Sequence, residues 1–76
     1  MTPAQLLAFE RQHPGATPTK HARIRHELGI SEIRYYVLLE RAATSIDGIE
    51  ADPITARMVR ERVEARAAIR ARRTAA

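Results

Sequence analysis

The fold is decided by one stretch of the sequence, Ile24-Arg25-His26-Glu27-Leu28-Gly29-Ile30-Ser31-Glu32-Ile33-Arg34-Tyr35-Tyr36-Val37-Leu38. It has the pattern of one helix ending, a short turn and a second helix beginning. Gly29 supplies the left-handed conformation that ends the first helix, which a residue with a Cβ adopts only at a cost. Ser31 then caps the next helix, and Glu32 lies at the positive end of that helix. The stretch therefore predicts a helix-turn-helix.

The spacing of apolar residues supports this prediction. With Gly29 as the ninth residue of the unit, positions four, eight, ten, fifteen and eighteen are apolar, as two helices crossing steeply over a short turn require. These residues are Ile24, Leu28, Ile30, Tyr35 and Leu38. The fifth position, which is normally a small residue at the helix contact, is Arg25. Either the two helices lie further apart than usual, or Arg25 reaches out past the contact.

Three helix starts share one signal, a capping residue followed by proline: Thr2-Pro3, Thr17-Pro18 and Asp52-Pro53. Together with Ser31, they predict helices over about 3–12, 18–28, 32–43 and 53–73. Residues 44–51 are expected to form a loop, with Ile46 and Ile49 packed onto the core. The predicted fold is all-α, a small four-helix domain with a helix-turn-helix and a long basic C-terminal helix. We divide it into a helix-turn-helix domain, 1–64, and a basic C-terminal helical extension, 65–76.

Positive charge is concentrated at the C-terminal end. The formal net charge is +4, yet residues 1–50 contain six basic and six acidic residues, while 51–76 contain seven arginines against three acids. Such a basic end is typical of a protein with a polyanion partner, here double-stranded DNA, although solvated basic tails also occur. The chain has no cysteine and no apolar run of membrane-spanning length, so we expect a cytoplasmic protein, at the nucleoid, with no membrane partner.

Enzyme chemistry is not expected from these residues. There is no cysteine nucleophile, no glycine-rich phosphate loop and no histidine pair at metal-ligand spacing, since His21 and His26 lie about 140° apart around a helix. The carboxylates are scattered among arginines and are expected to form a solvated, paired surface. We therefore predict no catalytic residue, no metal and no cofactor.

The predicted DNA-reading element is the helix that follows Ser31, because the N-terminal part of the second helix of such a unit enters the major groove. Its outward side chains are Ser31, Glu32, Ile33, Arg34, Tyr36 and Val37. Arg34 is the leading candidate for a base or phosphate contact; the alternative is an ion pair with Glu27 or Glu32. Tyr36 is expected to reach a phosphate or a methyl-bearing base edge, whereas Tyr35 points inward.

Contacts to the DNA backbone are expected at two further places. Thr19 and Lys20, at the N-terminus of the helix over 18–28, are placed for phosphate contact, and Arg23 and Arg25 flank the groove on the same helix. The C-terminal arginines would add affinity that depends on salt and not on sequence. These are Arg66, Arg70, Arg72 and Arg73. The alternative for this tail is simple solvation and fraying.

The C-terminal helix carries two apolar stripes on different sides. One consists of Ile54, Met58, Ala65 and Ile69, and the other of Ala56, Val59, Val63 and Ala67. A small core can bury only one stripe over the first turns. The second stripe is either a chance feature of an alanine-rich helix or the contact surface of a homodimer formed through this helix.

The chain resembles a known family at Phe9-Glu10-Arg11, at Ile24-Arg25, at the run from Leu28 to Tyr36, and at Asp52-Pro53 followed by an arginine-rich helix. This is a family of small uncharacterised proteins of actinobacteria and their phages, a domain of unknown function with a Gly-Leu/Ile-Ser-x-x-Arg-Tyr-Tyr core. The resemblance covers about residues 5–73 and implies a compact helical domain of DNA-binding type, with no catalytic residue. Where members carry a tryptophan pair after Phe-Glu, this chain has Gln12-His13-Pro14, so different packing is expected beside the first helix.

The function expected from these features is that of a small DNA-binding protein. It would be a transcriptional regulator, a phage repressor-like or excision factor, or a nucleoid-associated protein. The alternative is a protein-interaction module, such as an adaptor of the transcription machinery, for which Ile33, Tyr36 and Val37 would form an apolar contact patch. A third hypothesis is a phage or toxin-antitoxin component that folds on a partner, because the core is small.

Overall fold

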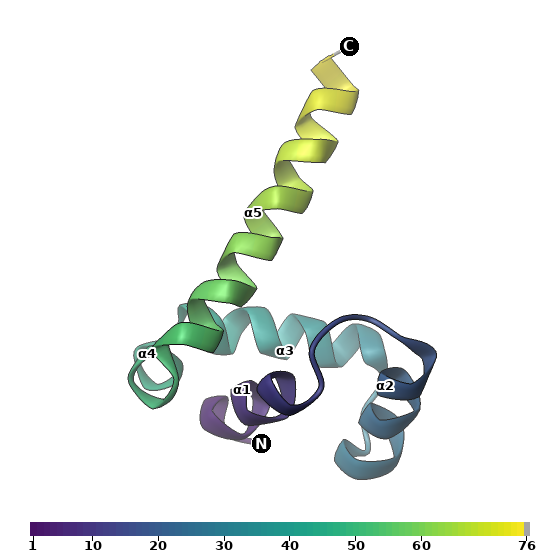
Figure 1. Cartoon of the computed structure of the whole chain (residues 1–76), viewed down its shortest axis with the longest axis vertical. Helices are drawn as coiled ribbons and strands as arrows, with labels where there is room; N and C mark the ends of the chain where they lie inside the picture. The colour runs from purple at the N-terminus through teal and green to yellow at the C-terminus, as the bar shows by residue number, and fades with distance from the viewer. Residues whose placement is uncertain (76) are drawn as a thin grey trace.

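The computed structural model describes residues 1–75 and is all-α, as predicted, with no strand in that range. Figure 1 shows a compact base of short helices from which the last helix rises. The elements are α1 (Pro3–Gln12), α2 (Pro18–Arg23), the π-helical turn η1 (Ile24–Leu28), α3 (Glu32–Thr44), α4 (Ile46–Ala51) and α5 (Pro53–Ala75). Residues 1–75 thus contain five α-helices where four were predicted.

The predicted helix starts are confirmed by their capping hydrogen bonds. Thr2 and Gln5 form a reciprocal capping box at α1, and the side chains of Thr17 and Ser31 accept from the backbone N–H three residues on. At α5, the Asp52 carboxylate accepts from the backbone N–H of Thr55 at 3.1 Å. Hydrogen bonds from Thr55 hold the pKa of the Asp52 carboxyl below its usual range.

The segment from α2 to α3 has the predicted helix, turn and helix. Gly29 has φ +70°, the left-handed conformation that the turn requires. The five predicted apolar positions all contribute to the core or pack against it, with Ile24 and Tyr35 fully buried. Arg25 is exposed, so it reaches past the helix contact. The π-helical turn η1, where the backbone is wider than in an α-helix, was not predicted from the sequence.

The predicted loop over 44–51 is wrong, because Ile46–Ala51 form the short helix α4. Ser45 begins this helix: its hydroxyl accepts from the N–H of Gly48 at 2.9 Å and donates to the carbonyl of Ala42 at 2.8 Å. Gly48 is buried, and a Cβ at this position would overlap the Ala42 carbonyl, so the glycine lets α4 approach the end of α3. Ile46 and Ile49 were expected on the core, but both are exposed.

The hydrophobic core lies among α1, α3 and α5, which pack against one another. Its buried apolar members are Leu6, Leu7, Phe9, Ile24, Tyr35, Leu39, Ala42, Ala43, Ala56 and Val59. The Phe9 ring packs between His13, at 4.7 Å between ring centroids, and Tyr35, at 5.5 Å. The Gln12-His13-Pro14 segment thus packs an imidazole ring against Phe9 beside the first helix.

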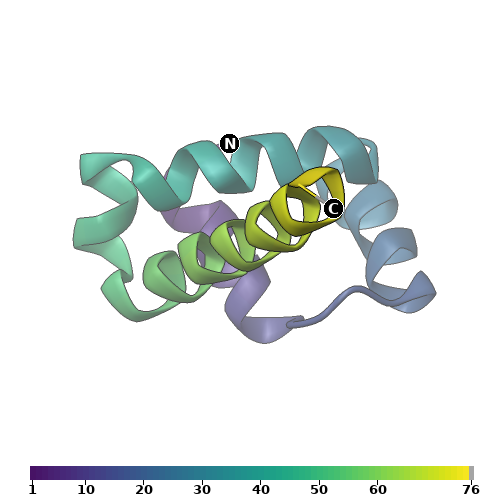
Figure 2. The same cartoon turned by 90° about the horizontal axis from the view of Figure 1, so that it is seen from above.

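Helix α5 leaves the core about halfway along its length. Residues 64–75 are all exposed, and Figure 1 shows this end standing away from the other helices. In the view from above, α5 crosses in front of the other helices (Figure 2). The helix continues unbroken across the expected boundary at residue 64, and the predicted last residue of the extension, Ala76, lies outside the described residues. None of the helices in residues 1–75 has the combination of length and apolar character that spanning a bilayer requires.

The two stripes of α5 have roles opposite to those expected for a dimer. Ala56 and Val59, from the stripe assigned to a partner chain, are buried in this chain's own core. Ile54, Met58 and Ile69, from the other stripe, remain exposed. A homodimer through α5 would therefore use the Ile54 stripe.

Candidate nucleic-acid interface

The outward face of α3 begins directly after the turn. Ser31 caps the helix and is exposed, Arg34 is exposed, and Ile33 and Val37 are 76% and 43% exposed although both are apolar. These four side chains form the α3 face. Ile33 and Val37 each border a hollow between α3 and α5, so this face lies beside α5, and all four side chains remain exposed.

Arg34 makes no ion pair with any carboxylate in residues 1–75. The two carboxylates considered as its alternatives pair elsewhere: Glu27 with Arg23 at 3.3 Å, and Glu32 with Nδ1 of His21 at 2.6 Å. The guanidinium of Arg34 therefore keeps its donors for an external acceptor. Glu32 is engaged at the contact between α2 and α3, so it does not extend from the α3 face as predicted.

Lys20 does not lie on the surface, contrary to the phosphate contact predicted for it. It is 3% exposed, and its Nζ donates to Oε1 of Glu10 at 2.6 Å and to the carbonyl of Gly15 at 2.6 Å. The Nζ also lies over the rings of Tyr35 and Tyr36, at 5.6 and 5.4 Å from their centroids. A buried ammonium held by a carboxylate cannot reach a DNA backbone. Thr19, Arg23 and Arg25 remain exposed on α2 and η1.

The buried carboxylate of Glu10 joins four elements of the fold. It is 1% exposed and accepts hydrogen bonds from Lys20, from the Tyr35 hydroxyl at 2.8 Å and from Arg62 at 2.9 Å. We call these four residues the Glu10 cluster. The prediction of a fully solvated set of carboxylates is therefore wrong at Glu10. Its position, four after Leu6 and three after Leu7, places it on the buried side of α1, a signal that the sequence did contain.

The hydroxyl of Tyr35 is held in its protonated form. Burial raises its pKa well above the usual value, and the hydrogen bond to Glu10 raises it further. Because the pKa of Tyr35 is higher in the folded chain than in the unfolded chain, its protonated, hydrogen-bonded hydroxyl contributes to stability. This contribution is fully present below the pKa of the unfolded chain's phenol. It is lost as the pH rises towards the folded-state value.

Tyr36 does not reach outward to a phosphate, contrary to the prediction. Its ring packs edge-on against Tyr35 at 5.1 Å and against His21 at 6.1 Å, and burial raises the pKa of its hydroxyl. The hydroxyl oxygen is enclosed and has no hydrogen-bond partner in the described chain. A tyrosine on the flank of α3 that faces α5 is covered by the neighbouring elements, which the sequence pattern of α3 alone does not reveal.

A row of arginines continues the buried side of α5 beyond the core. Residues at steps of three or four share one side of a helix, so the row that starts at buried Val59 continues through Arg62, Arg66, Arg70 and Arg73. Arg62, which the sequence did not single out, binds Glu10, and Arg66 lies 3.7 Å from Glu40 of α3. Arg70 and Arg73 make no ion pair within residues 1–75. Arg72 is exposed on another side of the helix.

Two tyrosines side by side offer a matched test of the Glu10 cluster. We expect Tyr35→Phe to lower the free energy of unfolding by about 1–3 kcal/mol, because it removes a buried hydrogen bond to a charged acceptor. Tyr36→Phe removes an enclosed hydroxyl that has no partner, so it should leave the free energy of unfolding unchanged or raise it. Urea denaturation of both variants measures the difference. Equal losses would contradict the assignment of the two hydroxyls.

Comparison with known proteins identifies one family. The family model described as "Protein of unknown function (DUF3263)" matches residues 2–73, nearly the whole chain. No curated protein and no solved structure matches the chain. Within residues 1–75, no group of three or more histidine, cysteine, aspartate or glutamate side chains is placed to hold a metal ion.

Proposed function

The chain belongs to the family described as "Protein of unknown function (DUF3263)", and we propose from its own residues that it is a small DNA-binding protein. In this proposal the N-terminal half of α3 enters the major groove, and arginines of α5 hold the phosphate backbone. The role would be that of a transcriptional regulator, a phage repressor-like or excision factor, or a nucleoid-associated protein in an actinobacterial or phage setting. The proposal includes no catalytic step.

The observation that carries the proposal is the proximity of the α3 face to the arginine row. Ile33 of α3 and Arg66 of α5 line the same cavity, so the start of α3 and the row lie on one side of the molecule. A partner that meets Ile33 at the start of α3 is therefore close to Arg66 on the cationic side of α5. A DNA duplex presents base edges in its major groove and phosphates on either side of it. Helix α3 could meet the base edges while the arginines of the neighbouring α5 meet the phosphates.

The charge of the two elements supports a polyanion as the partner. From residue 65 to residue 75, α5 carries four arginines and no acid, and all of them are exposed. Arg34, Arg25 and Thr19 add donors on the helix-turn-helix side. Arginine is suited to this task because its planar guanidinium makes paired hydrogen bonds to phosphate and guanine.

Arg34→Ala tests the reading role of α3. On a preferred sequence selected from random duplexes, we expect this variant to lose about 1–3 kcal/mol of binding free energy and part of its sequence preference. Arg57→Ala is the matched control, because it removes the same charge from an exposed site whose guanidinium pairs with Glu61 at 3.0 Å. Competition binding with preferred and random duplexes measures both effects. If Arg34→Ala weakened binding to all sequences alike, the recognition role of α3 would be wrong.

A protein-interaction module is the second candidate, and the exposure of Ile33 and Val37 favours it. Two large apolar side chains beside each other on a free helix face are typical of a contact patch for another protein. In that case Ile33→Asp would abolish partner binding, whereas Arg34→Ala would have little effect. The outcome of the DNA titration decides between the two candidates.

A further inference from the structure

The outer side of α5 carries a row of apolar side chains that the rest of the described chain leaves exposed. Ile54 is 73% exposed, Met58 48% and Ile69 42%, and Ala65 between them is exposed as well. We call these four residues the α5 stripe. The core uses another side of the same helix, so the α5 stripe keeps its apolar surface in water unless a partner covers it.

The spacing of the α5 stripe is the same from either end. Successive members are four, seven and four positions apart, over about 22 Å of helix. Two copies of α5 that run in opposite directions are therefore in register, with Ile54 opposite Ile69 and Met58 opposite Ala65 of the other copy. Each large side chain near the middle meets a small one, which lets the two helices approach closely. Glu61, at the midpoint, is paired within its own chain by an arginine at 3.0 Å.

The distribution of charge favours the antiparallel direction. From residue 46 to residue 64, α4 and the first half of α5 carry five acidic residues and three arginines, whereas residues 65–75 carry four arginines and no acid. An antiparallel pair places the acidic part of each copy beside the basic part of the other. A parallel pair would place the two basic ends together, where like charges repel.

Unpaired charges lie at both ends of this contact. Asp47 and Glu50 of α4 are exposed and make no ion pair within residues 1–75, and the same holds for Arg72. Arg72 follows Ala65 by seven residues, so it continues the side of the α5 stripe. In the antiparallel register it lies at the level of residue 51 of the other copy, where the acidic α4 ends.

We propose that two copies of this chain pair through the α5 stripe, with their α5 helices antiparallel and related by a two-fold axis. The stripe supplies the apolar contact, and the basic end of each α5 meets the acidic α4 and first half of α5 of the other copy. Because the contact is only one helix wide, it is small for a stable interface, and we expect a dissociation constant of about 10 µM. The pairing itself does not depend on DNA binding.

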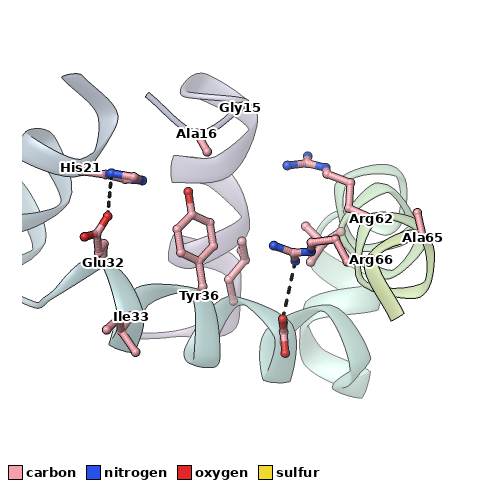
Figure 3. A pocket seen from close by; sticks show the side chains of 12 residues that line it. Gly15, Ala16, His21, Glu32, Ile33, Tyr36, Arg62, Ala65 and Arg66 are labelled. Atoms are coloured by element: carbon pink, nitrogen blue, oxygen red, sulfur yellow. Dashed lines mark ion pairs between the residues drawn. The ribbon is translucent and has the colours of Figure 1, made fainter. Parts of the chain in front are cut away.

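One consequence of the pairing rests on the proposed function. The arginine row lies about a quarter turn around α5 from the α5 stripe, so the two-fold axis keeps both rows on the same face of the pair. Figure 3 shows Arg62 and Arg66 extending from α5 on the side of α3, and Ile33 at the start of α3 lines the same cavity as Arg66. Both α3 starts therefore accompany both rows, as in dimers that bind an inverted repeat in DNA.

Sedimentation equilibrium of the full chain without DNA tests the pairing. With increasing concentration, the apparent mass should rise from 8.5 kDa towards twice that value. Ile69→Glu should weaken the dimer by at least about tenfold, because it places a carboxylate in an apolar contact. Ile33→Glu is the matched control, since it makes the same change at an exposed isoleucine of α3 and should leave the dimer intact. Circular dichroism checks that both variants are folded.

Two results of this measurement would overturn the proposal. One is a chain that remains monomeric up to about 1 mM, a concentration far above the expected dissociation constant. The other is an equal loss of dimer in Ile33→Glu and Ile69→Glu, which would place the contact elsewhere. The samples contain no DNA, so a monomeric chain would leave the proposed DNA contacts untouched, and a dimer without DNA affinity would contradict only the proposed function.

Cross-linking tests the direction of the two helices, because the chain has no cysteine of its own. Ile54→Cys and Ile69→Cys variants, mixed in equal amounts under a mild oxidant, should form a disulfide between the two different variants. Each variant alone should remain uncross-linked, because identical positions lie about 22 Å apart in the antiparallel register. Disulfides that form within each variant alone, and not between them, would show a parallel pair and contradict the proposal.

Discussion

Glu10→Gln is expected to lower the free energy of unfolding by about 3–5 kcal/mol, because it leaves the Lys20 ammonium buried without a counter-charge. A small domain has only about 5–15 kcal/mol of stability in total, so a large share of this chain would unfold at physiological temperature. The loss is concentrated at Lys20, since Arg62 is partly exposed and can regain water. Urea denaturation followed by circular dichroism measures the change.

A double variant separates lost charge pairing from lost packing. Glu10→Gln combined with Lys20→Met removes both buried charges and keeps an amide that accepts from Tyr35, so most of the loss should be recovered. The exposed pair of Arg57 and Glu61 is the surface control, and breaking it should cost little. If Glu10→Gln alone were as mild as this control, the Glu10 cluster would not hold the fold together as described.

Replacing Arg66, Arg70, Arg72 and Arg73 by glutamine is expected to weaken binding to any duplex by about 10²–10³-fold near 0.1 M salt. The slope of log affinity against log salt should become shallower by about 3–4, because about 0.9 counterions are released for each phosphate neutralised. Glutamine keeps a high helix propensity, so α5 should remain helical, which circular dichroism can check. The loss should be the same for preferred and random sequences.

Single substitutions distinguish the arginine row from net charge. Arg70→Gln and Arg57→Gln remove the same charge from the same helix, but only Arg70 shares the side of Val59. We expect Arg70→Gln to weaken DNA binding clearly more than Arg57→Gln does. Equal losses would mean that affinity follows the total charge, and the row on α5 would have no special role.

The sequence was a good guide where structure depends on neighbouring residues. Gly29, Ser31 and the apolar positions around them predicted the turn and its packing, because left-handed backbone, caps and helical spacing act over a few residues. The same reasoning missed α4. Gly48 suggests a loop by itself, and only the close approach to Ala42 explains why a helix there needs glycine.

The sequence was a poor guide where partners are distant. Lys20 was predicted to contact phosphate because it lies at a helix start, but it is buried and pairs with the carboxylate of Glu10, ten residues earlier. Arg62 meets the same carboxylate from 52 residues away, which no local pattern signals. Tyr36 is covered because α5 and the start of α2 lie beside it. In each case tertiary packing, which is decided by the whole chain, determines which polar side chains remain available.

The most direct test of the proposed function is fluorescence anisotropy of a random-sequence duplex about three helical turns long, titrated with the full chain at several salt concentrations. The account predicts binding at low salt that weakens linearly on logarithmic axes, with a slope of about −3 or steeper. The absence of binding even at the lowest salt concentration would contradict it and would leave the exposed Ile33 and Val37 as a contact for a protein partner.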